Sequence, residues 1–263
     1  MDQANPELEH LLTIIEKISG GDYSNEIMNL TTNATSEPIR SIAEAMGMMM
    51  VKVEAREFRL EQLIEELRQL NEQIRRNTVQ TIAAMAQALE ARDAYTRGHA
   101  ERVASLAAEI ASEMGQDRET VERVRTAGLL HDIGKIGCSD RIFQDHGPKN
   151  PPEVVKEIIS HPTVGAEILG GLEFLDAVTA IVHAHHEQLN GKGYPRGLDE
   201  TSIPMEAKII AVADGFDAMT TDRPYQKARP EEAALDILRS KSGSKWDSTC
   251  VAALERILAR KRL

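Results

Sequence analysis

Residues 129–135 of the chain have the sequence Leu-Leu-His-Asp-Ile-Gly-Lys, at the end of a helix that is predicted to begin after Asp117. His131 and Asp132 place an imidazole nitrogen beside a carboxylate that can bridge, and both groups are ligands for transition metals. Lys135 follows within a turn, from where its ammonium group can reach an anion held on such metals. An isolated His-Asp pair also occurs as an ordinary polar helix end, so this stretch needs support from other residues.

Further polar groups lie on both sides of this stretch, and seven of the eight histidines follow residue 92. His99 opens a predicted amphipathic helix, and His185-His186 end an apolar one. Asp214 follows the apolar run 209–213, where a buried carboxylate is costly unless a partner such as a metal offsets its charge. Taken singly, His161 or Asp214 is more simply explained as a hydrogen-bonded interior group. Together, the groups favour a functional cluster around the His-Asp pair.

The composition predicts an all-helical protein. The 263 residues are rich in Ala, Leu, Ile, Glu and Arg, while aromatic residues make up only 3%. A formal net charge of −11, from 42 acidic and 31 basic side chains, disfavours general binding to nucleic-acid polymers or anionic membranes. Cys138 and Cys250 form no Cys-x-x-Cys pair, so we expect two reduced thiols.

The sequence contains no candidate membrane span. No apolar run approaches the roughly 18 residues that indicate one, and the acidic, polar residues 1–9 do not resemble a secretory signal. We therefore expect a cytoplasmic protein, or else the soluble part of a larger membrane-associated sensor.

Residues 1–50 are predicted to form a helical signalling segment. A first amphipathic helix ends at Gly20-Gly21, and the polar stretch 25–36 is expected to be a connector. A second helix is expected from Glu37, with Pro38 in its first turn. This order, with Gly-Asp-Tyr-Ser at 21–24, resembles a HAMP signalling domain. Two ordinary amphipathic helices are the alternative.

Residues 51–78 are predicted to form a coiled-coil linker helix that runs directly into the C-terminal domain. The stretch is highly charged, lacks helix breakers and has apolar residues at alternating spacings of three and four, which are a and d positions. These residues are Leu60, Leu63, Leu67, Leu70 and Ile74. We expect a parallel homodimer through this helix, with an intramolecularly packed helix as the alternative.

Residues 79–263 resemble an HD-GYP domain, a subgroup of the HD metal-dependent phosphohydrolases. The name-giving parts are His131-Asp132 and Gly193-Tyr194-Pro195. The supporting matches, in family order and at family-like spacing, are Arg92-Asp93-Ala94-Tyr95-Thr96, His161-Pro162, His185-His186-Glu187, Ala213-Asp214-Gly215-Phe216-Asp217-Ala218 and Asp222-Arg223-Pro224-Tyr225. The resemblance implies an all-α fold, with an HD-domain helical bundle preceded by the long signalling helix.

The resemblance also implies a site with two divalent metal ions, iron or manganese. The implied metal ligands are His99, His131, Asp132, His161, His185, His186 and Asp214. Asp132 would bridge the metals, with His131 and Asp214 on the first and His161 and His185 on the second. The placement of His99 and His186 is left open. Some members hold a third metal through a glutamate at the position of Tyr95, so two metals are expected here.

Further roles follow from the same resemblance. Lys135 is implied to act in catalysis by stabilising charge on the phosphate oxygens, and also to bind substrate. Arg223, Tyr194 and Pro195 are implied substrate-binding residues. Gln226 stands where the family frequently has a second basic residue after the arginine. A positive charge expected to bind a second phosphate is therefore missing at this position.

The activity implied by the resemblance is hydrolysis of cyclic di-GMP to pGpG, GMP or both, in bacterial second-messenger signalling. Two alternatives remain open. One is an HD phosphohydrolase acting on another cyclic dinucleotide or a nucleotide. The other is a non-catalytic cyclic di-GMP receptor, although degenerate members of the family usually lose metal ligands and this chain keeps the set. Asp217 lies one turn after Asp214. It would either orient a metal ligand or be an ordinary polar residue on the helix.

Overall fold

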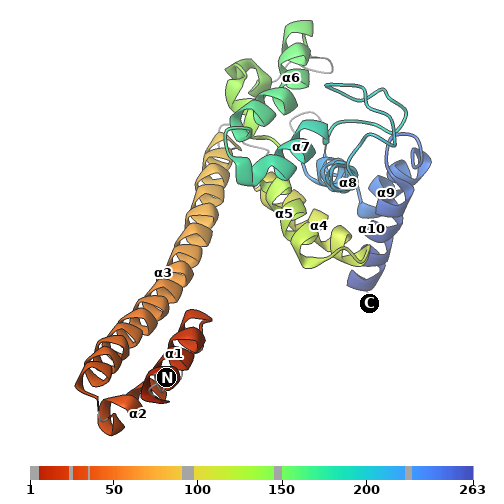
Figure 1. Ribbon diagram of the computed structural model, residues 1–263. Coiled ribbons are helices and arrows are strands. Elements are labelled where there is room, and N and C mark those ends of the chain that lie inside the picture. Colours follow the sequence, from red (N-terminus) through yellow and green to blue (C-terminus); the bar gives the residue numbers. More distant parts are fainter. Residues whose placement is uncertain are drawn as a thin grey trace. The chain divides into compact units, whose positions relative to one another are not determined.

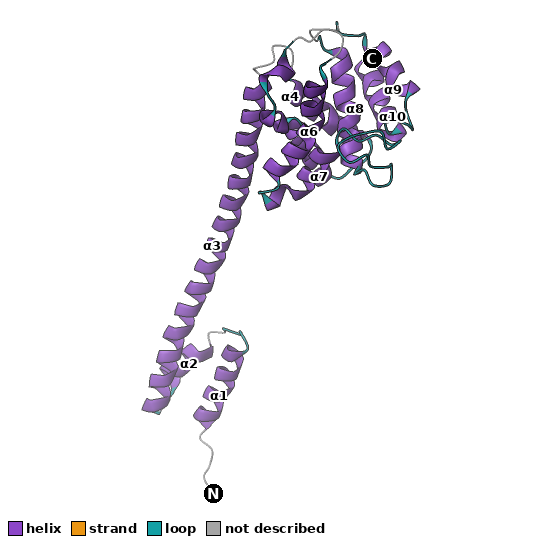
Figure 2. Cartoon of the chain, turned by 90° about the horizontal axis from the view of Figure 1, so that it is seen from above, coloured by secondary structure: helices purple, strands orange, loops and turns teal. Residues whose placement is uncertain are grey.

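The computed structural model describes residues 6–23, 26–34, 36–90, 98–144, 150–222 and 227–262. Within these ranges the chain is helical and forms no strand, apart from isolated bridges between Asn190 and Asp199 and between Ser242 and Trp246 (Figure 2). The predicted all-α fold is confirmed. Among the described helices, none combines the length and the hydropathy that crossing a bilayer requires.

The chain divides into two compact units, Met1–Ile74 and Arg75–Leu263. The first contains α1 (Pro6–Ser19), α2 (Glu26–Asn33) and the beginning of the long helix α3 (Glu37–Glu90). The helix predicted before Gly20 and the helix predicted from Glu37 are confirmed. Buried apolar side chains from the three helices, together with Ala34 after α2, form the core of this unit: Leu11, Ile14, Ile27, Leu30, Ala34, Ile39, Ala43 and Met50.

Helix α2 corrects one expectation, because it forms within the polar stretch that was predicted to be a connector. Ile27 and Leu30 lie three residues apart on one face, and both are buried in the core of the unit. The burial of this face stabilises a short helix that its Asn- and Thr-rich sequence does not favour by itself.

The second unit contains the end of α3 and the remaining helices (Figure 1). Its α-helices are α4 (His99–Glu113), α5 (Arg118–Leu130), α6 (Pro152–Leu169), α7 (Asp176–Ala184), α8 (Met205–Thr220), α9 (Glu231–Ser240) and α10 (Ser248–Lys261). Short 3-10 helices are η1 (Ile133–Gly137), η2 (Asp140–Phe143) and η3 (Glu173–Leu175).

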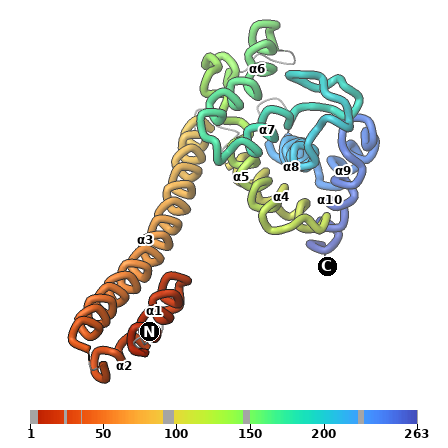
Figure 3. The backbone as a smooth tube through the Cα atoms, in the orientation of Figure 1, coloured from red at the N-terminus to blue at the C-terminus, as the bar shows by residue number. Residues whose placement is uncertain are grey.

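Helix α8 occupies the centre of this unit. Its residues Ile209, Ile210, Val212 and Ala213 are fully buried, as expected of a helix that is apolar on most of its sides. It contacts α4, α5, α7, α9 and α10, which surround it in Figures 1 and 3. The carboxylate of Asp214 therefore starts from the middle of the bundle.

Helices α4 and α5 form a closely packed pair. A Cβ atom on Gly128 would lie 2.6 Å from the Cα atom of Ala104, so the helices can approach this closely only with glycine at that position. The pair is joined by a short turn, so the beginning of α4 and the end of α5 lie together. His99 and His131 are thereby brought to within 5.2 Å between ring centroids.

We expect Asp247 to stabilise the second unit by capping α10. Its carboxylate accepts hydrogen bonds from the backbone N–H groups of Thr249 and Cys250. Replacing Asp247 with Ala should lower the free energy of unfolding by about 1 kcal/mol, whereas Asp247→Asn should retain most of it because asparagine also caps. Urea titrations that follow the fluorescence of Trp246, the only tryptophan, measure the difference.

The effect should also depend on pH in one direction. Burial disfavours the carboxylate, but its hydrogen bonds to Thr249 and Cys250 outweigh this and lower the pKa of Asp247. The stabilisation should therefore be complete at neutral pH and be lost only as the pH falls below about 4. An Asp247→Ala variant as stable as the wild type at pH 7 would contradict the capping role.

Candidate metal centre

Helix ends and two helix interiors bring together the side chains that the sequence singled out. His99 is the first residue of α4, His131 and Asp132 follow α5, and His185-His186 follow α7. His161 lies inside α6, and Asp214 inside α8. Four of these histidines are buried: His99, His131, His161 and His185.

The ligand atoms form two groups. In the first, donor atoms of His99, His131 and Asp214 all lie within 4.8 Å of one another. The distance from His99 Nε2 to Asp214 Oδ1 is 3.3 Å. Such spacing, with two imidazoles and one carboxylate, fits a single transition-metal ion.

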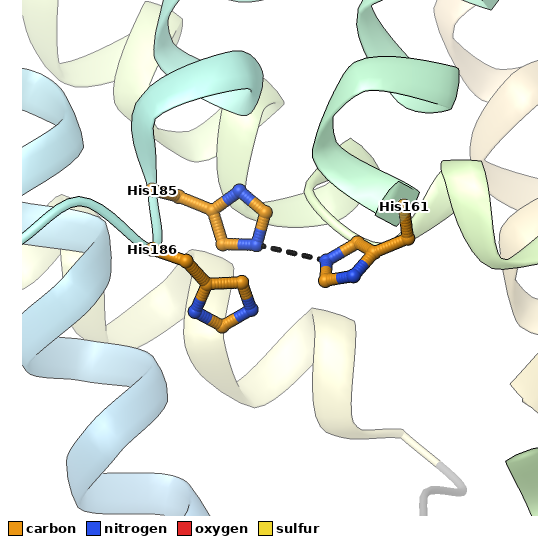
Figure 4. A group of neighbouring side chains, drawn as sticks. All are labelled: His161, His185 and His186. Carbon is orange, nitrogen blue, oxygen red and sulfur yellow. Dashed lines mark hydrogen bonds between the residues drawn. The ribbon is translucent and has the colours of Figure 1, made fainter. Parts of the chain in front are cut away.

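The second group consists of His161, His185 and His186, whose donor atoms also lie within 4.8 Å of one another. The Nε2 atoms of His161 and His185 are 3.3 Å apart, and the three rings face a common centre from two elements (Figure 4). His186, whose placement the sequence left open, lies in this group, and His99 lies in the first.

The carboxylate of Asp132 lies between the two groups. Its Oδ1 is 3.3 Å from His161 Nε2, while its Oδ2 is 3.5 Å from His131 Nε2 and 4.0 Å from His99 Nε2. One oxygen thus faces each group, which is the arrangement of a bridging ligand. Donor atoms of His131, Asp132 and His185 also lie within 4.8 Å of one another, so the two groups adjoin.

The rings are oriented by backbone carbonyl groups. Three histidines each place Nδ1 against the carbonyl oxygen three residues earlier: His131 to Gly128 (2.8 Å), His161 to Ile158 (2.5 Å) and His185 to Val182 (2.6 Å). A carbonyl only accepts, so each Nδ1 carries the proton and donates it. Each Nε2 is then left with its lone pair directed at the centre, as a metal ligand requires.

These carbonyl groups are available for a reason that the sequence contains. Gly128 and Val182 lie in the last turns of α5 and α7, where carbonyl groups have no partner within the helix. In α6 the carbonyl of Ile158 would normally accept from residue 162, but Pro162 has no N–H group. The proline thereby frees the carbonyl that orients His161.

His99 is oriented differently, by a carboxylate. Its Nδ1 is 2.7 Å from Asp217 Oδ2, and Asp217 in turn accepts from Arg102 Nε at 2.6 Å. Asp217 thus contacts a candidate ligand directly, as an orienting residue would. Burial disfavours a charged His99, but hydrogen bonds to Asp214 and Asp217 outweigh it and raise the pKa of His99 to about 9.

Electrostatics favour neutral imidazoles at His161, His185 and His186 and ionised carboxylates at Asp132 and Asp214. Burial lowers the pKa of His161 and His185, and that of His186 to about 3. Burial opposes ionisation of Asp132, but Lys135 and the surrounding histidines hold its pKa well below the usual range. The side chain of His99 similarly keeps the pKa of Asp214 low against burial. Neutral nitrogen and anionic oxygen donors are the forms that bind divalent transition metals, so the residues fit the implied metals.

Lys135 lies next to the candidate bridging carboxylate. Its Nζ is 2.5 Å from Asp132 Oδ2, from a position within η1. Gly134 brings this turn against α6, because a Cβ atom there would lie only 1.9 Å from the carbonyl oxygen of His161. The Gly-Lys pair after His-Asp therefore has a packing role and a charge role.

The Gly-Tyr-Pro segment packs against the second group of ligands. The ring of Tyr194 lies 4.8 Å from that of His186, centroid to centroid, and burial raises the pKa of Tyr194, so that its hydroxyl group stays protonated. Pro195 follows through a cis peptide bond and is half-buried. Gly193 is required because a Cβ atom would lie 2.4 Å from the Cα atom of Glu187.

Two glutamates that the sequence did not assign anchor the surroundings. The carboxylate of Glu187 accepts from the backbone N–H groups of Arg196 and Leu198, which holds the Gly-Tyr-Pro loop. The carboxylate of Glu90, the last residue of α3, accepts from the N–H groups of Gly98 and Ala100 at the beginning of α4. Glu187 was visible in the His-His-Glu match, whereas no sequence signal pointed to Glu90.

The structure does not describe every residue that the sequence singled out. Arg223, Tyr95 and Gln226 fall outside the described residues. His183 Nε2 lies 3.4 Å from Thr163 Oγ1. A cleft of about 500 Å³ opens beside the centre, and its wall includes His185, His186, Tyr194 and Asp214.

We expect Pro162→Ala to weaken metal binding without weakening the fold. Alanine restores an N–H group that competes with His161 Nδ1 for the Ile158 carbonyl. Loss of such an orienting bond should lower metal affinity by about tenfold, while the free energy of unfolding of the metal-free protein stays equal or rises. Metal titration and urea unfolding measure the two effects.

Pro152→Ala, at the beginning of the same helix, is the matched control, because no helical hydrogen bond is missing there. Equal metal affinity in Pro162→Ala and Pro152→Ala would show that the proline does not orient His161.

Comparisons with known proteins show the family to which the chain belongs. A family model for the HD domain matches residues 83–250. The cyclic di-GMP phosphodiesterase response regulator RpfG of Xanthomonas campestris is 34% identical over 251 residues, covering 86% of this chain and 66% of the relative. A cyclic di-GMP phosphodiesterase of Thermotoga maritima is 41% identical over 172 residues, covering 64% and 46%.

A 3'3'-cGAMP-specific phosphodiesterase of Vibrio cholerae is 36% identical over 177 residues, covering 67% of this chain and 38% of the relative. The chain thus spans only part of the length of these relatives. Among solved structures, an HDG"Y"P protein of Bdellovibrio bacteriovorus matches at a TM-score of 0.50 and 25% identity, covering 61% of this chain and 51% of that one. A cyclic GMP-AMP phosphodiesterase of Vibrio cholerae matches at 0.56 and 21% identity, covering 70% and 49%, and shows a shared fold.

Proposed function

Because the chain belongs to the HD domain family, we propose that it is a metal-dependent phosphodiesterase that hydrolyses cyclic di-GMP to pGpG, GMP or both. The relatives named as cyclic di-GMP phosphodiesterases support this substrate. The observation that carries the proposal is the position of Asp132, whose two carboxylate oxygens face two separate groups of imidazole ligands.

In this proposal the ligands divide as the geometry groups them. His99, His131 and Asp214 would hold one divalent cation, His161, His185 and His186 would hold the other, and Asp132 would bind both. Nitrogen and carboxylate donors together suit iron or manganese. When bound, two such cations would activate water for attack on phosphorus and offset the charge of the phosphate.

The other proposed roles, charge stabilisation and substrate binding, belong to side chains of the protein. Lys135 lies beside Asp132, so its ammonium group would stabilise the negative charge that grows on the phosphate oxygens during attack. Tyr194 would shape the substrate side of the centre by fixing the ring of His186. Pro195 and Arg223 are proposed substrate contacts on the resemblance alone.

A second candidate substrate is a mixed cyclic dinucleotide. It is favoured by the relatives of Vibrio cholerae that are named 3'3'-cGAMP-specific phosphodiesterases. A role as a receptor without catalysis has less support, because every predicted metal ligand lies at the centre.

We expect Asp132→Ala to abolish hydrolysis of cyclic di-GMP, because removing the candidate bridge separates the two groups of ligands. Product formation is measured by chromatography on protein purified anaerobically and supplied with iron or manganese, together with its metal content. Asp132→Asn, which keeps the shape but loses the charge, should also be inactive, and Glu200→Gln, an exposed change, should not.

Undiminished hydrolysis by Asp132→Ala would refute the mechanism. Faster turnover of 3'3'-cGAMP than of cyclic di-GMP by the wild type would instead select the second substrate.

We further propose that the chain forms a parallel homodimer through α3, with residues 1–50 as a HAMP-like signalling segment, 51–78 as the coiled-coil linker and 79–263 as the catalytic domain. Five apolar side chains at a and d spacing are 38 to 63% exposed on this helix: Leu60, Leu63, Leu67, Leu70 and Ile74. Pairing with a second copy would bury them.

The double variant Leu63→Lys/Leu67→Lys should be monomeric, because two charges would have to be buried in the seam. Light scattering coupled to size-exclusion chromatography gives the mass. Gln62→Lys/Gln69→Lys adds the same charge outside the seam and should stay dimeric. A monomeric wild type at high protein concentration would contradict the dimer.

A further inference from the structure

The cleft beside the metal centre has a basic edge that the motifs did not predict. Lys241 and Lys245 line it from the turn between α9 and α10, and Tyr194 and His186 belong to the same lining. We propose that these two lysines bind the second phosphodiester of a cyclic dinucleotide whose first phosphodiester lies at the metal centre. This inference rests on the proposed function and adds the residues that select a substrate with two phosphates.

The turn that carries the lysines is fixed against the loop that carries the Gly-Tyr-Pro segment. The backbone N–H of Asn190 donates to the carbonyl of Ser244 at 2.9 Å, and the Asn190 side chain donates to the Ser244 hydroxyl at 3.3 Å. Within the turn, the carbonyl of Lys241 accepts from the N–H of Lys245 at 2.8 Å. Both walls of the cleft are therefore held in one arrangement.

Lys245 is positioned next to the centre through Trp246. Its Nζ lies 4.4 Å from the centroid of the indole ring. The indole N–H donates to the carbonyl of Ala211 at 3.1 Å, and a Cβ atom on Gly215 would lie 3.2 Å from the ring. The indole thus packs on α8 beside Asp214, and the ammonium group lies on this rigid support.

The charges at this edge are suited to an anion. Within the described parts of the chain, no carboxylate lies within ion-pair distance of either ammonium group. Burial lowers the pKa of Lys245, and the positive charge of the nearby Lys241 lowers it further. The negative charge of Asp214 acts in the opposite direction. Two close cations repel each other, and a phosphate between them would relieve this repulsion.

A cyclic dinucleotide requires such a second anion site. It has two phosphodiester groups, and a centre built around Asp132 can bind one of them. Lys135 lines a different, smaller cavity together with Asp132, and its role proposed above is at the first phosphate. Since glutamine occupies position 226, Lys241 and Lys245 supply positive charge for the second.

The test compares two substrates on the metal-loaded protein. Bis(p-nitrophenyl) phosphate has one phosphodiester, and cyclic di-GMP has two. The variants Lys241→Met and Lys245→Met should each lower the ratio of kcat/KM for cyclic di-GMP to that for bis(p-nitrophenyl) phosphate by about tenfold, mainly through KM. Lys241→Arg and Lys245→Arg should restore most of the ratio, because the charge is retained.

Lys156→Met, an exposed change on α6 outside the cleft lining, is the control and should leave the ratio unchanged. Lys241 is itself exposed, so its variant tests the proposal even if Lys245→Met disturbs the packing on Trp246. Ratios within twofold of the wild type for both methionine variants would overturn the inference while leaving the phosphodiesterase intact. A wild type that hydrolyses neither substrate would overturn the proposed function itself.

Discussion

The metal centre depends on one repeated interaction, the hydrogen bond from a histidine Nδ1 to the carbonyl three residues earlier. It occurs at His131, His161 and His185. Each bond uses a carbonyl that the helix cannot satisfy, because the helix ends there or because Pro162 lacks an N–H group. The bond satisfies a buried acceptor and fixes a ring and its tautomer at the same time. Folding of the helices therefore orients these candidate ligands by itself.

The cost of this arrangement is a cluster of buried polar groups, and the carboxylates offset it. Asp132 and Asp214 are ionised, burial lowers the pKa of His161, His185 and His186, and His99 is paired with Asp217. The two oxygens of Asp132 face separate groups of imidazoles, so this one side chain lies next to both groups. The buried apolar residues of helix α8 exclude water from Asp214 on the side of the core.

The end of the long helix α3 is connected to the beginning of α4 through the carboxylate of Glu90. Glu90 caps the beginning of α4 by accepting from the N–H groups of Gly98 and Ala100, and His99 lies between them. Glu187 holds the Gly-Tyr-Pro loop in the same manner, because its carboxylate accepts hydrogen bonds from two backbone N–H groups of that loop. Glu90 and Glu187 thus hold backbone segments near the candidate metal ligands Asp132 and Asp214.

The sequence alone determined the helical class, the ends of α1 and α5 and the ligand candidates, because periodicity, capping residues and motif spacing are local properties. It did not determine helix α2, whose polar sequence is overridden by the burial of Ile27 and Leu30. Nor did it place His99 and His186 in their groups, or bring Lys241 and Lys245 to the cleft. Those positions depend on which helix ends meet in space. Only tertiary packing decides that, because contacts between residues far apart in the chain leave no periodic signal in one sequence.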